Sequence, residues 1–235
     1  MVSAAASEKS ITTSALNEII ASVRTADGVE HPERWVAGLK HPSLPARPTR
    51  WNLPQPGEPL PFPWEVQLNP LLVHPLWGPS PLSWCLAFDP TTGNARHGRV
   101  HYDLSLCDAD YAQPATWPFL THMHFNAVSG DEAPIFPWPF TVVNERGIKV
   151  GDVLSEIYKM FQTVVMDDER SSWPLHRRQL AEKAWMDRCH ALELGQRAEE
   201  AGGIRRCDSF GAMMFFRGIE PSIDGGGWMI TFGTY

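Results

Sequence analysis

The sequence lacks a long apolar run and an excess of positive charge. No stretch approaches the roughly 20 unbroken apolar residues that a transmembrane helix needs. The chain carries 20 Lys and Arg against 27 Asp and Glu, for a formal net charge of −7. Its densest basic pairs, Arg177-Arg178 and Arg205-Arg206, fall far short of a basic stripe. Because an acidic chain repels phosphate backbones, we expect no nucleic acid and no membrane among its partners.

The chain also lacks paired cysteine motifs. Its four cysteines are Cys85, Cys107, Cys189 and Cys207. No two of them form a C-x-x-C pair, which argues against a zinc ribbon or a thioredoxin-type site. The first ten residues contain no apolar core of the kind that signal peptides have. We therefore expect a soluble cytoplasmic protein whose thiols stay free in a reducing compartment.

No signature of a catalytic or phosphate-binding loop is present. The G-x-S-x-G turn of hydrolases does not occur in the sequence. The three glycines at 225–227 lack the Lys and the Ser or Thr that complete a phosphate loop. The sequence therefore predicts no cofactor and indicates no catalytic residue.

Proline and tryptophan are abundant instead, with 21 and 10 residues respectively. Prolines recur from position 32 to position 63, where each one removes a backbone donor and fixes φ. We predict that residues 1–62 form a proline-rich N-terminal arm with one possible short helix at 12–24. The arm is either extended in solution or docked through Trp35 and Trp51. A docked arm would act as a lid or exchange between two copies to make a homodimer.

Residues 63–235 are predicted to form a single α+β domain. Short runs rich in β-branched and aromatic residues, bounded by Pro, Gly or Asn, are typical of strands. The expected strands are 64–68, 82–88, 119–125, 138–143, 213–219 and 228–233.

Two helices are expected in the second half of the chain. One covers 151–166, where apolar residues recur with helical period. The other begins near Pro174 and runs to about Ala201, with a thinner apolar stripe consisting of Leu180, Ala184, Trp185, Cys189 and Leu192. We expect these helices to pack against a mixed or antiparallel sheet.

Several blocks of sequence occur together in a recognisable order. They are PWEVQLNPLL (63–72), PLSWCLAFDP (81–90), QPATWPFLTHMHF (113–125), FPWPFTVVNERGIKVGDVLSEIY (136–158), GIRRCDSF (203–210) and FFRGIE (215–220). Over about residues 63–233 the chain resembles a domain-of-unknown-function family that is abundant in mushroom-forming fungi. The resemblance implies a fungal source and a fold unit, but no reaction. The family pattern usually has an acidic residue where this chain has Cys85.

The sharpest local motif is His122-x-His124. On a strand, alternation places both imidazoles on one face, and such pairs occur in metal sites that recruit further ligands. His97, His101 and Asp103 are candidates for those ligands. The alternative, which we favour, is two histidines on the solvent face of a strand, because two histidines alone do not complete a coordination shell.

A second group consists of Arg205, Arg206, Asp208 and Arg217. Arginine and aspartate around a core segment usually form a structural ion pair, and we favour that interpretation. A functional alternative has an arginine bind an anionic ligand or Asp208 act as an acid–base group. An Asp208 that is buried and paired to Arg206 or Arg217 would be structural, whereas a catalytic Asp208 requires an open pocket.

These observations favour an intracellular binding or interaction module with an aromatic-lined groove. Its ligand, a protein or a small molecule, remains open. The candidate ligand-binding residues are Trp64, Trp84, Arg206, Asp208 and Arg217. The alternative is a small-molecule enzyme, either metal-dependent through the His122–His124 pair or acid–base through Asp208.

Overall fold

The computed structural model describes residues 61–75, 80–98, 105–129, 136–191 and 202–234. Nearly all of the predicted N-terminal arm, including Trp35 and Trp51, lies outside the described residues. The same holds for His101 and Asp103. The docking of the arm and its exchange between two copies therefore stay predictions.

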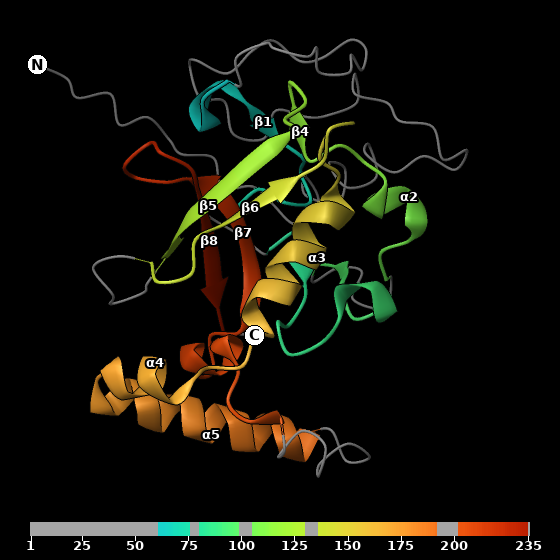
Figure 1. Cartoon of the computed structure of the whole chain (residues 1–235). Helices are drawn as coiled ribbons and strands as arrows, with labels where there is room; N and C mark the ends of the chain where they lie inside the picture. The colour runs from blue at the N-terminus through green and yellow to red at the C-terminus, as the bar shows by residue number, and fades with distance from the viewer. Residues whose placement is uncertain (1–60, 76–79, 99–104, 130–135, 192–201, 235) are drawn as a thin grey trace, which may run out of the picture.

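A four-stranded sheet with the order β6-β5-β8-β7 forms the centre of the structure (Figure 1). Its strands are β5 (His122–Ser129), β6 (Phe140–Val143), β7 (Phe215–Pro221) and β8 (Trp228–Gly233). The β5–β6 and β7–β8 pairs are antiparallel, whereas β5 and β8 run parallel. The sheet is therefore mixed. On β5 the apolar Met123 and Phe125 point into the core, and the alternating polar residues face outward.

Two short antiparallel pairs of strands lie outside the central sheet. They are β1 (Gln67–Leu68) with β4 (Thr116–Trp117), and β2 (Leu82–Ser83) with β3 (Arg96–His97). The predicted strands 64–68 and 82–88 thus shrink to two residues each. Single bridges connect Val73 to Ile219 and Cys85 to Phe215 along the edge of β7. Gly218 permits this approach, because it has φ of 135° and a Cβ there would lie 2.4 Å from the His74 backbone.

The first long helix, α3 (Val150–Phe161), packs against the sheet in the place that its apolar stripe predicts. Asp152 accepts a 2.9 Å hydrogen bond from the backbone N–H of Lys149, which satisfies a free donor at the helix start. Val153, Leu154 and Ile157 are completely buried. The helix ends at Phe161 rather than at Met166, because the chain then runs along the segment before the short helix η4 (Arg206–Phe210), as the Val164–Arg205 bridge shows.

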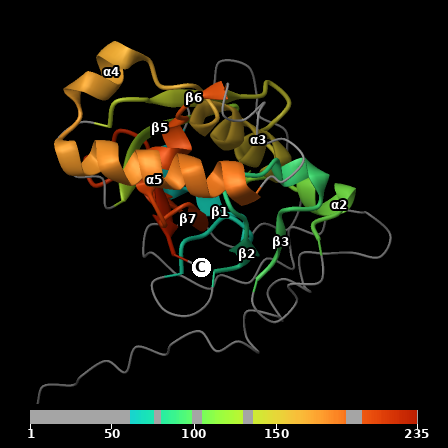
Figure 2. The ribbon, with the colours of Figure 1, turned by 90° about the horizontal axis from the view of Figure 1, so that it is seen from below.

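A helical hairpin of α4 (Asp167–Ser172) and α5 (Leu175–Ala191) lies at one end of the sheet (Figure 1). The sequence predicted α5 but not α4, which is six residues long and has acidic residues in its first turn. Pro174 separates the two helices, because the residue before a proline avoids helical ψ, and Trp173 has ψ of 147°. Viewed from below, α5 lies across the end of the sheet (Figure 2).

The face that α5 turns toward the core differs from the predicted stripe. Leu180 is 50% exposed, whereas Ala181, Ala184, Arg188 and Cys189 are buried. The predicted stripe was therefore wrong at Leu180 and omitted Arg188. A charged residue takes a core position because η4 (Arg206–Phe210) supplies a carboxylate opposite to it.

Between sheet and helices lies a core in which Phe161 is the central side chain. Its ring contacts four other rings at centroid distances of 5.3–6.4 Å, those of Phe136, Trp138, Phe210 and Phe232. The predicted α+β class, with a mixed sheet of short strands and helices in the second half of the chain, is confirmed. Within the described ranges, no helix is long and apolar enough to cross a membrane.

Candidate functional site

The two predicted tryptophans lie in separate places. Trp84 is 1% exposed, and its Nε1 donates a 2.9 Å hydrogen bond to the Phe88 carbonyl, so it is a core residue. Trp64 is half-buried and stacks on Phe62 with ring centroids 4.7 Å apart. A Cβ on Gly225 would lie 2.7 Å from the Trp64 ring, which places that ring against the β7–β8 loop.

Asp208 is fully buried in a two-pronged ion pair with Arg188 of α5. Its Oδ1 lies 2.9 Å from Arg188 Nε and its Oδ2 lies 2.8 Å from Arg188 Nη2, and neither side chain is exposed. The backbone N–H of Arg205 also donates to Oδ2 at 2.8 Å. This arrangement marks Asp208 as a structural residue that fastens α5 to η4.

The partner that the sequence suggested for Asp208 was wrong. Arg188 makes the pair, and it comes from a helix that the sequence presented as a surface element. Its spacing was the available signal, because Ala181, Ala184 and Arg188 recur at i, i+3 and i+7 on one helix face. The charge of Arg188 argued against a core position, because a buried arginine is rare unless a carboxylate pairs with it.

The other two predicted arginines make contacts with groups other than Asp208. Arg217 is half-buried on β7, and its Nη2 donates to the carbonyl of Thr234. The guanidinium of Arg206 lies over the Trp138 ring, 5.1 Å from its centroid. Burial lowers the pKa of Arg206 from its ordinary value, and the nearby Glu169 carboxylate opposes that shift.

His122 and His124 are both exposed on one face of β5, as alternation along the strand predicted. Each Nδ1 lies 3.0 Å from a threonine hydroxyl, that of Thr121 or Thr141. No group of three or more His, Cys, Asp or Glu that could hold a metal ion occurs in the described part of the chain. His97, proposed as a further ligand, is buried with its Nε2 3.2 Å from Asp110 Oδ2.

An aromatic–arginine cluster joins the α4–α5 hairpin to the core. We use this name for Trp138, Glu169, Trp173, Arg177 and Arg206. Arg177 of α5 lies 4.9 Å from the Trp173 ring centroid and 5.6 Å from that of Trp138. Trp138 Nε1 donates to the Glu169 carboxylate. Arginines that lie against aromatic rings are held by cation–π attraction and by the area that they bury.

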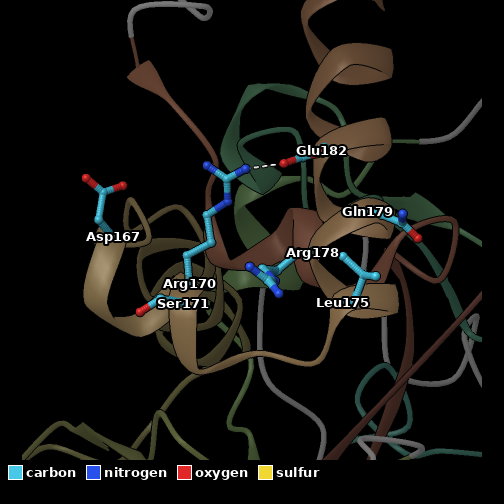
Figure 3. Close-up of a pocket in the computed structure, with 7 residues that line it drawn as sticks. All are labelled: Asp167, Arg170, Ser171, Leu175, Arg178, Gln179 and Glu182. Atoms are coloured by element: carbon cyan, nitrogen blue, oxygen red, sulfur yellow. Dashed lines mark hydrogen bonds and ion pairs between the residues drawn. The ribbon is translucent and has the colours of Figure 1, made fainter.

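A pocket of about 350 Å³ lies between α4 and α5 (Figure 3). The residues that line it are Asp167, Arg170, Ser171, Leu175, Arg178, Gln179 and Glu182. Arg170 and Glu182 form an ion pair across the two helices. None of the five ligand-binding candidates from the sequence lies among these residues. The volume is at the lower end of the range for ligand sites in proteins.

Arg178 is the basic residue of this pocket that has no ion-pair partner in the described ranges, and Asp167 is the acidic one. Its Nε is shielded from solvent and has no hydrogen-bond partner, and its guanidinium forms no ion pair within the described ranges. Figure 3 shows its side chain extending from α5 toward α4, while Asp167 points away from it. A shielded and unsatisfied guanidinium nitrogen is costly. Such a group is therefore a candidate for binding an acceptor from outside the chain.

Residues 82–226 match the model of a family of unknown function, DUF6699. This range covers more than half of the chain. The chain belongs to this family. No curated protein and no solved structure matches it. The predicted resemblance to a family of unknown function is thereby confirmed, whereas its abundance in mushroom-forming fungi stays a prediction.

The DUF6699 match includes most of the structure that carries the pocket. Both helices of the hairpin, the aromatic–arginine cluster and the Arg188–Asp208 pair all lie within residues 82–226. Trp64 and β8 lie outside the matched range. The pocket is therefore part of the family's own domain.

Proposed function

We propose that this DUF6699 protein is a binding module whose ligand site is the pocket between α4 and α5. The observation that carries the proposal is the guanidinium of Arg178, which has a shielded and unpartnered Nε inside a pocket of about 350 Å³. Groups that serve only the fold are normally paired. The leading hypothesis from the sequence, a binding module, is retained, but its site moves from an aromatic groove to a polar helical pocket.

The attachment of the hairpin supports a preformed site. Arg188 and Asp208 clamp the C-terminal half of α5 to η4, and Arg177, near the start of α5, lies against two tryptophan rings. The Arg170–Glu182 ion pair also connects the two helices. A site whose walls are fixed before binding has less conformational entropy to lose on binding.

Binding has more support than catalysis on this structure. The acid–base hypothesis relied on Asp208, which is buried and bound to Arg188. The metal hypothesis relied on His122 and His124, and no further His, Cys, Asp or Glu joins them in the described ranges to form a group of three. The pocket itself offers a guanidinium, an amide, a hydroxyl and one apolar side chain, groups that recognise ligands by charge, hydrogen bonding and contact.

Fragment screening by NMR tests this proposal. Methyl-labelled protein would be titrated with anionic, neutral and cationic fragments of two to eight heavy atoms, a size range of roughly the pocket's capacity. We expect fragments to shift the methyl signals of Leu175, which lines the pocket, and to leave those of Leu180 unchanged. Leu180 is a suitable reference because it is also exposed on α5 and does not line the pocket.

A pair of neighbouring serines supplies the matched control. Ser171 lines the pocket and Ser172 does not, yet both are exposed and each hydroxyl donates to the carbonyl three residues earlier. Ser171→Tyr should fill the pocket and abolish the Leu175 shifts, whereas Ser172→Tyr should preserve them. Equal shifts at Leu175 and Leu180, or equal effects of the two tyrosines, would contradict the proposal.

A further inference from the structure

We infer that the group bound by this pocket is a carboxylate carried on a short apolar stem, and that Arg178 is its anchor. The inference rests on the proposed function, because it assigns the chemistry of the ligand for the same pocket. It depends on three features, namely the charge of the pocket, the geometry of Arg178 and the position of Leu175.

The charges of the pocket leave one guanidinium for a ligand. Arg170 is paired with Glu182, and Asp167, the other lining carboxylate, points away from Arg178 (Figure 3), so Arg178 has no ion-pair partner in the described ranges. One guanidinium matches one carboxylate in charge. A doubly charged phosphate would leave an excess negative charge beside the carboxylates of Asp167 and Glu182, and like charges at such a site repel.

The geometry of a guanidinium also favours a carboxylate. Arginine presents its N–H groups as a planar fork that matches the two oxygens of a carboxylate. Arg178 extends from α5 toward α4 (Figure 3), so an acid that enters the pocket would meet the fork. Ser171 lines the same pocket, but its hydroxyl points away from Arg178 (Figure 3) and donates to the Asp168 carbonyl at 2.8 Å.

Leu175 accounts for the apolar stem. Its side chain lines the same pocket and is 62% exposed, which is high for leucine. An aliphatic stem next to the carboxylate would cover this surface, and burial of apolar area favours the complex. Two sources carry this chemistry, a free branched acid and a glutamate side chain in a protein segment.

The test compares an acid with its uncharged isostere. The probes are 3-methylbutanoate, 3-methylbutanamide and inorganic phosphate, followed through the Arg178 Nε–H signal and the Leu175 methyl signals. We expect the acid to bind at least about tenfold more tightly than the amide or phosphate, since charge-assisted and bidentate hydrogen bonds are the strong ones. Binding of the acid should weaken as salt is added.

Variants at Arg178 complete the test. Arg178→Gln should lower the affinity for the acid at least about tenfold. The affinity of Arg178→Lys should lie between those of the wild type and of Arg178→Gln, because lysine keeps the charge but not the planar fork. Arg146→Gln is the control, since Arg146 is exposed on the turn before α3, outside the pocket. Arg178 makes no ion pair in the described ranges, so its variants should unfold at the wild-type denaturant concentration.

A comparison with peptides distinguishes the two sources of the carboxylate. The peptide acetyl-Ala-Leu-Glu-Ala-amide would be compared with its Gln counterpart and with the free acid. Tighter binding of the Glu peptide than of the free acid identifies a protein segment as the ligand, and the reverse identifies a small acid.

The possible failures are distinguishable. If the acid and the amide bind with equal affinity, or if Arg178→Gln binds the acid as tightly as the wild type does, the pocket binds ligands but the carboxylate inference is overturned. If phosphate binds better than the acid, the ligand chemistry is wrong. If no fragment of any charge shifts Leu175, the proposed function itself fails.

Discussion

The sheet with α3 and the α4–α5 hairpin are held in the structure by different forces. On the sheet side, Phe161 contacts four aromatic rings, and Val153, Leu154 and Ile157 are completely buried. The hairpin is attached by a buried ion pair, by an arginine that contacts two tryptophan rings and by two small alanines. Apolar contacts tolerate small shifts, whereas charged contacts demand a matched partner. The hairpin is therefore the region where a single charge change has the largest effect.

Removing the charge of Asp208 is expected to have the largest effect. Asp208→Asn leaves the Arg188 guanidinium buried without a counter-charge, which costs about 3–5 kcal/mol of unfolding free energy. Urea denaturation would measure the loss, and hydrogen exchange should show that α5 loses protection before β5 does.

A double variant sharpens this result. Arg188→Met with Asp208→Leu removes both charges together and should recover most of the stability, because apolar replacements of a buried pair are often neutral. A loss below about 1 kcal/mol for Asp208→Asn, or equal exchange in α5 and β5, would show that the two regions are not held differently.

Truncating a core residue of α3 is expected to have the next largest effect. Leu154→Ala removes a completely buried side chain and should cost about 3 kcal/mol through lost transfer energy and a residual cavity. The comparison is Met186→Ala on α5, where the side chain is 49% exposed and the cost should stay within about 0.5 kcal/mol. Similar urea midpoints for the two variants would contradict the assignment of the core to the α3 side.

Removing the side chain of Arg177 tests the aromatic–arginine cluster. Arg177→Ala should cost about 1 kcal/mol, the usual strength of a partly exposed cation–π contact, and should alter tryptophan fluorescence because Trp138 and Trp173 lose a neighbour. Lys183→Ala on the exposed face of the same helix serves as the control. If both variants leave fluorescence and stability unchanged, the cluster does not hold the hairpin.

The smallest expected effect concerns Tyr111 beside α3. Burial, followed by the nearby Asp110 carboxylate, raises the pKa of Tyr111 from 10.0 to about 12. The folded protein therefore favours the neutral phenol, so this stabilisation is complete below pH 10 and disappears as the pH rises toward about 12.

Tyr111→Phe isolates this contribution to the pH dependence. The variant loses the hydrogen bond from the phenol to the Pro90 carbonyl and should be about 1 kcal/mol less stable at neutral pH. The difference in unfolding free energy between wild type and variant should narrow from pH 10 to about 12. If urea titrations show that this difference widens over the same range, the predicted direction of the pH dependence is wrong.

Apolar periodicity in the sequence predicted the sheet-side region well. The α3 stripe and the alternation on β5 are local patterns whose buried positions follow from helix and strand geometry. The strands 64–68 and 82–88 were overestimated, because pairing over only two residues depends on partners elsewhere in the chain. The helix α4 was missed because it is only six residues long and carries no apolar stripe.

The candidate site was harder to predict than the fold. Arg178 was visible in the sequence only as half of a basic pair, and nothing in its local pattern separates it from Arg177. The two arginines are neighbours in sequence, yet one contacts the rings of Trp138 and Trp173 and the other enters a pocket with no partner in the described ranges. This difference arises because successive helix positions point in directions about 100° apart.

The sequence by itself determined the fold class, the core face of α3, the outward position of His122 and His124 and the membership of a family of unknown function. These properties follow from local periodicity and from the order of residues along the chain. Only the tertiary structure decided that Arg188 pairs with Asp208, that Trp84 is a core residue and that Arg178 occupies a pocket. Those pairings join segments far apart in the chain, and the free energy of a charge depends on which segments fold around it.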